Sequence, residues 1–177
     1  AEEYRKKLYS MIPRIRLSDL LIEVDSWTQF SQEFIHDSTG KPPNEQEKKI
    51  VFATLLGLGM NIGLEKMAQS TPGITYPQLA NTKQWRFYKE ALTCAQSILV
   101  NFQLGIPIAD FWGEGKTSAS DGMRVPVGVS AIKSDVNPHY KSLEKGATMI
   151  RSINDRNTSH HVEVVSTNTR EATHTLD

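Results

Sequence analysis

Apolar residues recur every three or four positions in the first part of the chain. Over residues 17–34 this spacing predicts a helix with one apolar face. Gly40–Pro43 interrupts the pattern, because glycine and consecutive prolines end helices. Asn44 followed three residues later by Glu47 has the form of a capping box, so a second helix is expected over residues 44–67.

The next stretch contains a turn and two further helical segments. Thr71–Gly73 has turn composition, and a short helix or an irregular segment is expected over residues 78–84. A longer helix is expected over residues 85–103, because Gly105 and Pro107 follow it as stop signals.

The pattern changes near residue 111, where Gly, Ser and Thr become more frequent and short alternating runs begin. Strands are expected over residues 117–129, 147–153 and 160–166, with a hairpin link over 154–159 and a helix from about residue 168. The sequence therefore predicts an α+β chain. Residues 1–110 form a helical segment in this prediction, and residues 111–177 form a β-β-β-α unit.

Charge, hydropathy and cysteine content exclude several classes of protein. Lys and Arg number 20, and so do Asp and Glu, so the formal net charge is zero and a site for a polyanion must be local. No apolar run reaches the roughly 18 residues that a membrane span needs. The single cysteine, Cys94, excludes an internal disulfide and fits a reducing cytoplasm.

The two ends of the chain suggest a piece of a longer protein. The chain begins at Ala1, and it ends at Asp177 inside an expected helix, with no glycine, proline or basic residue to cap it. Part of a functional site is therefore expected to lie outside the chain.

Two glycine-rich stretches match cofactor-binding loops only in part. Gly57–Gly63 lacks the spacing of a dinucleotide-binding fingerprint and follows no strand, so close helix packing is the simpler interpretation. Gly113–Thr117 is similar to a phosphate-binding loop, but Asp110 stands where that pattern requires glycine. A turn that leads into a strand is the simpler interpretation, in which Lys116 could still meet a phosphate as a point charge.

Asp121 is the acid whose position asks for an explanation. It lies in the middle of the first expected strand, among small residues. A carboxylate disfavours a strand core unless it has a partner or a task. A structural role and a metal-binding role both remain open on these residues alone.

Five stretches of the chain resemble, in order, the catalytic region of the replicative class II transposases of the Tn3 family. They are Pro13–Asp25, Gly63–Ala68, Thr75–Ala80, Trp112–Gly122 and Thr169–Asp177. Trp112–Gly122 resembles the stretch that carries the family's first catalytic aspartate. Thr169–Asp177 resembles the helix that follows the family's third strand.

This resemblance implies that residues 111–177 are the N-terminal part of an RNase H-like domain with a DDE acid triad. It implies that Asp121 is the first catalytic acid and a metal ligand, and that the other two acids lie beyond the chain. Lys116 and Arg124 are candidate contacts to DNA phosphates. The complete site would hold two Mg²⁺ ions, which stabilise the attacking and leaving oxygens of phosphoryl transfer. One carboxylate cannot hold both ions, so this chain alone is expected to bind Mg²⁺ weakly and to be inactive.

The resemblance predicts part of a bacterial, cytoplasmic DNA transposase that cleaves transposon ends and joins the 3′-hydroxyl to target DNA. Its expected partners are transposon-end DNA, target DNA and other copies of the full-length protein, with no membrane. Two alternatives stay open. One is a non-catalytic helical scaffold or DNA-binding module, and the other is a nucleotide-binding protein that uses Gly113–Thr117.

Overall fold

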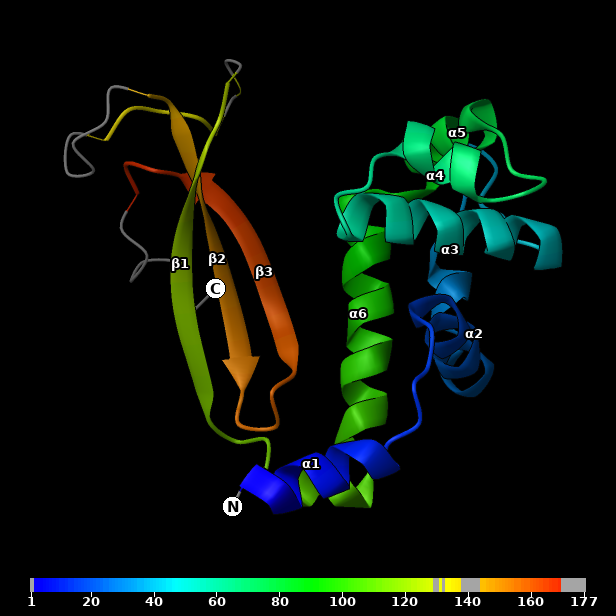
Figure 1. Cartoon of the computed structure of the whole chain (residues 1–177). Coiled ribbons are helices and arrows are strands. Elements are labelled where there is room, and N and C mark those ends of the chain that lie inside the picture. The colour runs from blue at the N-terminus through cyan, green and yellow to red at the C-terminus, as the bar shows by residue number, and fades with distance from the viewer. Residues whose placement is uncertain (1, 129–130, 132, 138–143, 170–177) are drawn as a thin grey trace. The chain divides into compact units, whose positions relative to one another are not determined.

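The chain divides into a helical unit and a unit built on a β-sheet. The computed structural model describes residues 2–128, 131, 133–137 and 144–169 (Figure 1). Contacts within the chain define two compact units, Ala1–Ile98 and Leu99–Asp177. The boundary along the chain falls inside helix α6 (Lys89–Leu104), so the last six residues of that helix belong with the sheet unit. The fold is α+β, as the sequence predicts.

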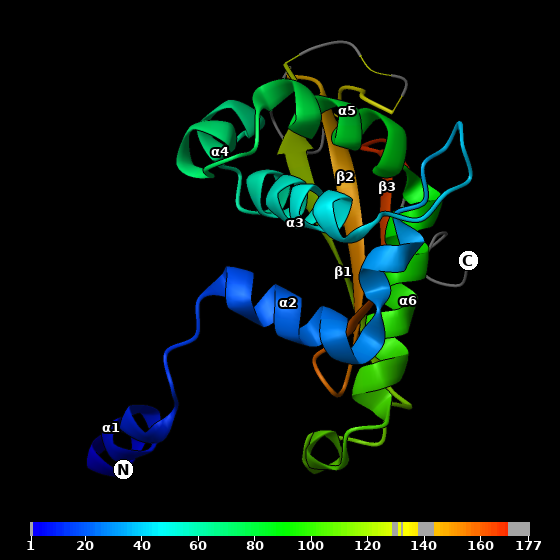
Figure 2. The ribbon, with the colours of Figure 1, turned by 90° about the vertical axis from the view of Figure 1, so that its right-hand side faces the viewer.

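The helical unit is centred on α3, which α4 and α5 contact (Figure 2). Its elements are α1 (Glu2–Met11), α2 (Leu17–Thr28), the 3-10 helix η1 (Phe30–Glu33), α3 (Glu45–Gly59), α4 (Leu64–Ser70), α5 (Tyr76–Arg86) and the first part of α6. Ala53, Met67 and Leu79 form the buried core of these three helices, one residue from each. Each helix therefore buries one apolar face against the other two.

The capping box at the start of α3 is confirmed. The Asn44 side chain accepts hydrogen bonds from the backbone N–H groups of Gln46 and Glu47, both at 3.0 Å. The Glu47 carboxylate accepts one from the Asn44 N–H at 2.9 Å. These bonds satisfy N–H groups that have no partner inside the helix, which fixes where α3 begins.

The helix boundaries differ from those that apolar spacing alone predicts. The helix expected over 17–34 stops at Thr28, because Gln29 adopts a left-handed conformation with φ 55°, and η1 carries the apolar pattern onward. The helix expected over 44–67 is two helices, separated by Asn61 at φ 53° and Gly63 at φ 83°. The helix expected over 85–103 starts only at Lys89.

Gly57 explains why α3 and α4 approach closely. A Cβ atom at this position would lie 3.3 Å from Cβ of Met67 on α4. A side chain there would require Met67 to shift by a few tenths of an ångström, since real Cβ contacts are rarely so short. The helix-packing interpretation of the Gly57–Gly63 stretch is therefore confirmed at Gly57.

The second unit contains a three-stranded antiparallel sheet in the order β1-β2-β3, which Figure 1 shows as adjacent strands. The short 3-10 helix η2 (Pro107–Phe111) precedes the strands β1 (Ser118–Pro126), β2 (Gly146–Asn154) and β3 (Ser159–Ser166). This meander confirms the three expected strands. The helix expected from residue 168 falls largely on residues 170–177, which lie outside the described part of the chain.

One face of this sheet is buried and the other is exposed. Along β2 the buried side chains are Thr148, Ile150 and Ser152, and Ile150 is only 1% exposed. Residues on the other face alternate with these, as strand geometry requires. Met123 of β1 and Val162 of β3 lie on that face and are 61% and 43% exposed.

Candidate functional site

Asp121 lies on β1 with its side chain exposed. One carboxylate oxygen, Oδ1, accepts a hydrogen bond from the N–H of Gly122 at 2.9 Å. Its strand neighbours, Ser120 and Gly122, are small. The carboxylate is therefore held by a rigid element while solvent or a ligand can still reach it.

The register places Arg151 of β2 directly opposite Asp121. Paired residues in an antiparallel sheet lie on the same face, so the two charged side chains share the exposed one. On its other side Arg151 pairs with Val162 of β3. The other side chains on this face are mostly apolar: Ala119, Met123 and Val125 on β1, Ala147, Met149 and Ile153 on β2, and Val162 and Val164 on β3.

Asp121 fits the requirements of one Mg²⁺ ligand. Mg²⁺ takes hard oxygen ligands and keeps several waters, so one exposed carboxylate on a rigid strand suits it. Among the described residues, no group of three or more His, Cys, Asp or Glu is placed to hold a metal ion. The described part of the chain thus supplies one candidate ligand and not a complete metal site.

Lys116 and Arg124 do not share one face of the sheet with Asp121. Lys116 lies in the loop before β1 and forms an ion pair with Glu114, and both side chains are exposed. Arg124 is three residues beyond Asp121 on the same strand, which puts it on the opposite face. Its Nη2 donates a hydrogen bond to the carbonyl of Glu144 at 2.6 Å.

The Gly113–Thr117 loop wraps around a carboxylate of its own chain. The N–H of Gly115 donates to Oδ1 of Asp155 at 2.8 Å, and the Thr117 hydroxyl donates to Oδ2 at 3.1 Å. A Cβ on Gly113 would lie 2.5 Å from Cγ of Asp155, so only glycine fits there. The Gly115 N–H, a donor that a phosphate loop would offer its ligand, is therefore engaged by Asp155.

Asp155 is held in its charged form. Burial of the carboxyl acts to raise its pKa, but the hydrogen bonds from Thr117 and Gly115 and the nearby Arg156 charge outweigh it, so the pKa is lowered. The ionised carboxylate is the form that accepts these hydrogen bonds, and it fixes the loop that leads into β1.

Arg156 ties the same loop to the end of α6. This residue is 8% exposed, and its guanidinium donates to the carbonyls of Gly113 and Leu104, both at 2.9 Å. It also forms an ion pair with Asp110 at 2.7 Å. Local sequence patterns predict residues 154–159 only as a turn and do not reveal this anchor, because its partners lie more than forty positions away in the chain.

The helical unit holds a buried ion pair that local sequence patterns also do not reveal. Asp25 of α2 is 4% exposed, and it lies 3.7 Å from the ammonium group of Lys48 on α3. The N–H and the hydroxyl of Ser31 donate to its carboxylate at 2.8 and 2.9 Å. Because these partners satisfy the carboxylate inside the unit, its evident role is to join α2 and η1 to α3.

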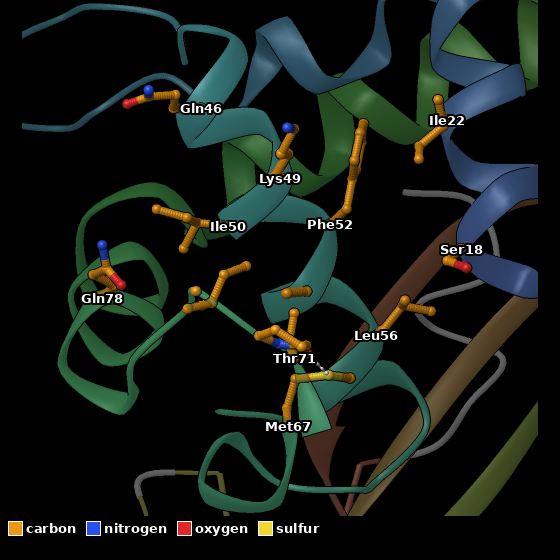
Figure 3. Close-up of a pocket in the computed structure, with 14 residues that line it drawn as sticks. Ser18, Ile22, Gln46, Lys49, Ile50, Phe52, Leu56, Met67, Thr71 and Gln78 are labelled. Atoms are coloured by element: carbon orange, nitrogen blue, oxygen red, sulfur yellow. Dashed lines mark hydrogen bonds between the residues drawn. The ribbon is translucent and has the colours of Figure 1, made fainter. Parts of the chain in front are cut away.

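Figure 3 shows an apolar pocket in the helical unit, with a volume of about 560 Å³. Ile50, Phe52 and Leu56 of α3 line it, together with Met67 of α4, whose sulfur accepts a hydrogen bond from Thr71 at 3.3 Å. Polar side chains, among them Ser18, Gln46, Lys49 and Gln78, also line it. The pocket contains no carboxylate, so it offers no ligand for a hard metal ion.

A search of the described residues for a helix that could cross a membrane gives none that is both long and apolar enough.

Comparison with known proteins identifies the family. The family model described as the Tn3 transposase DDE domain matches residues 19–177. The chain belongs to this family of transposases. The match covers both units, including β1 and Asp121.

Relatives from several bacteria match along almost the whole chain. The transposase for transposon Tn1546 of Enterococcus faecium is 49% identical over 177 residues, which is 100% of this chain and 18% of the relative. The transposase for transposon Tn501 of Pseudomonas aeruginosa is 36% identical over 168 residues, covering 94% of this chain and 17% of the relative. The transposase for transposon Tn4556 of Streptomyces fradiae is 30% identical over 175 residues, covering 99% and 20%. The chain thus spans about a fifth of the length of these relatives or less.

Proposed function

We propose that this chain is part of the catalytic region of a bacterial DNA transposase. The parent protein cleaves the ends of a transposon and joins their 3′-hydroxyl groups to target DNA in replicative transposition. The observation that carries the proposal is the place of Asp121, an exposed carboxylate on the first strand of an antiparallel meander within a DDE-family chain. Residues 111–177 are the start of an RNase H-like domain in this proposal, and residues 1–110 are the helical segment that precedes it.

Asp121 acts as one metal ligand in this proposal. A bound Mg²⁺ ion supplies charge that stabilises the attacking or leaving oxygen of the phosphodiester. The carboxylate of Asp121 fixes the position of that charge, because β1 is held by pairing along its whole length. Lys116 is exposed before β1, where it can contact a neighbouring DNA phosphate, and Arg124 is the second candidate for such a contact.

The remaining ligands belong to other parts of the parent protein. This part of the proposal is supported by the described residues, in which no group of three or more His, Cys, Asp or Glu could hold a metal ion, since a pair of metal ions needs several carboxylates. The chain alone is therefore inactive and binds Mg²⁺ weakly. The partners of the parent are transposon-end DNA, target DNA and other copies of itself, in the cytoplasm.

The test is Asp121→Asn in the full-length transposase. This change keeps the size of the side chain and removes the charge that holds a metal ion. End DNA should still bind within about threefold of wild type, while cleavage and strand joining should fall by at least roughly a thousandfold, since the metal site is lost. Electrophoresis of labelled end DNA measures both reactions.

Asp19→Asn is the matched control, because Asp19 is an exposed carboxylate on α2 whose contact with Arg16 is an exposed pair at 3.9 Å. It should behave as wild type. Normal strand joining by the Asp121→Asn protein would refute the catalytic role, and the scaffold alternative would then be favoured.

A further inference from the structure

Arg151 differs from the other described cations of the sheet unit in having a free charged group. Lys116 pairs with Glu114, Arg124 bonds to the Glu144 carbonyl, and Lys133 donates to the carbonyl of Val164 at 2.7 Å. Arg156 is buried among its partners, and Lys145 also has an interaction. The Arg151 side chain is exposed, and within the described residues its guanidinium has neither a hydrogen-bond partner nor an ion-pair partner.

This free cation lies next to the candidate metal ligand Asp121. Arg151 is the cross-strand neighbour of Asp121, and such neighbours have their Cβ atoms about 4.5–5.5 Å apart. The two side chains lie side by side on the exposed face, yet they form no ion pair among the described residues. Arg151 therefore does not neutralise the charge of Asp121, and both charged groups are available to a ligand that approaches this face.

The surroundings favour a ligand with a concentrated negative charge. Arg151 is flanked on its own strand by Met149 and Ile153 and on β3 by Val162, all apolar. When a ligand covers such a surface and displaces water, the attraction between charges increases because the local dielectric falls. A guanidinium presents a planar fork of donors that matches the oxygens of a phosphate.

We infer that Arg151 is a phosphate-binding residue, which holds a non-bridging oxygen of the DNA phosphate at the Asp121 site. A carboxylate that carries a metal ion and a guanidinium on the adjacent strand would contact the same phosphate from two sides. The phosphate is thereby fixed relative to the metal, and the charge that develops during transfer is stabilised. This inference rests on the proposed function of Asp121 and adds a second residue to that site.

The first measurement needs no metal ion. End-DNA affinity of the full-length transposase is measured without divalent cations at a series of salt concentrations, for wild type and Arg151→Gln. Each lost phosphate contact should reduce the slope of log affinity against log salt by about 0.9. Lys66→Gln is the control, because it removes one exposed positive charge from α4, away from Asp121 in the sequence. It should leave the slope unchanged if the effect of Arg151→Gln comes from a lost phosphate contact and not from the lower net charge.

The second measurement is cleavage with Mg²⁺ at saturating DNA. Arg151→Gln should be slower by roughly a hundredfold, as expected when one donor to a developing charge is lost. The cleavage rate of Arg151→Lys should lie between those of wild type and Arg151→Gln, because lysine keeps the positive charge but lacks the planar fork of donors. The Arg151 side chain is exposed and has no hydrogen bond or ion pair within the described residues, so the melting temperature should stay unchanged and exclude a folding defect.

The outcomes separate this inference from the proposed function. An unchanged salt slope for Arg151→Gln, or cleavage within threefold of wild type while Asp121→Asn is inactive, would overturn the role of Arg151 alone. Full activity of Asp121→Asn would instead overturn the proposed function. A reduced salt slope and slow cleavage for Arg151→Gln, together with an inactive Asp121→Asn protein, would support both the role of Arg151 and the proposed function.

Discussion

Single residues of the sheet unit divide between structural and candidate functional roles according to their partners. Asp155 and Arg156 are enclosed by hydrogen bonds and an ion pair, so their charges are used within the chain. Asp121 and Arg151 are exposed on one face of the sheet, where a ligand can reach them. The glycine-rich loop belongs to the first group, since it binds the Asp155 carboxylate.

Asp155 should make stability depend on pH in the acid range. Because the pKa of Asp155 is lowered on folding, its charge stabilises the protein at pH values above its ordinary pKa of 3.8, and this contribution is lost as pH falls through the folded pKa. At pH 7 the Asp155→Asn variant should unfold at lower urea than wild type. The difference should shrink as pH falls below about 4, because the Asp155 carboxyl of the unfolded wild-type chain then takes up a proton, and that of the folded chain follows at lower pH.

Urea titrations at pH 7 and near pH 3 measure this effect. Glu23→Gln, a change at an exposed carboxylate in the middle of α2, should unfold like wild type at both pH values. A difference between Asp155→Asn and wild type that stays constant from pH 7 to pH 3 would contradict the charged role of Asp155.

At the scale of helices and strands, the sequence predicts features that depend on neighbouring residues, but not those that depend on backbone conformation or on distant parts of the chain. The capping box at Asn44 and the three strands follow from neighbouring residues, so pattern and turn composition predict them. The break between α3 and α4 was missed, since left-handed backbone at Asn61 leaves no mark on the apolar spacing. The pairing of Asp121 with Arg151 depends on strand register, which neither strand encodes alone.

The buried pair between α2 and α3 should contribute strongly to stability. Asp25→Ala leaves the Ser31 donors and the Lys48 ammonium without their buried acceptor, which should lower the free energy of unfolding by about 3 kcal/mol. Asp19→Ala, at an exposed pair on the same helix, should change it by less than about 0.5 kcal/mol. Urea unfolding followed by Trp27 fluorescence measures the free energy of unfolding of both variants. Equal losses for Asp25→Ala and Asp19→Ala would contradict a stabilising role of the buried Asp25 contacts.

At the scale of the whole molecule, the sequence predicts the class of fold and the family, while the proposed chemistry needs metal ligands besides Asp121. The α+β fold and the transposase family both follow from patterns that extend along most of the chain. The candidate site is less predictable, because Asp121 could be located from its strand but Arg151 could not. The chain covers 18% and 17% of the first two relatives, so they are more than five times as long, which agrees with the proposal that other segments complete the metal site.

The proposed catalytic role of Asp121 is tested most directly by changing the metal preference of the full-length transposase. Asp121→Cys replaces a hard oxygen ligand by a thiolate, which binds Mg²⁺ poorly and accepts softer divalent ions more readily. We expect Asp121→Cys to cleave end DNA undetectably with Mg²⁺ and to regain part of its activity with Mn²⁺. Asp121→Ser should stay inactive with both ions. Wild-type cleavage by Asp121→Cys in Mg²⁺, or the same response of the Cys and Ser variants to Mn²⁺, would contradict metal binding by Asp121.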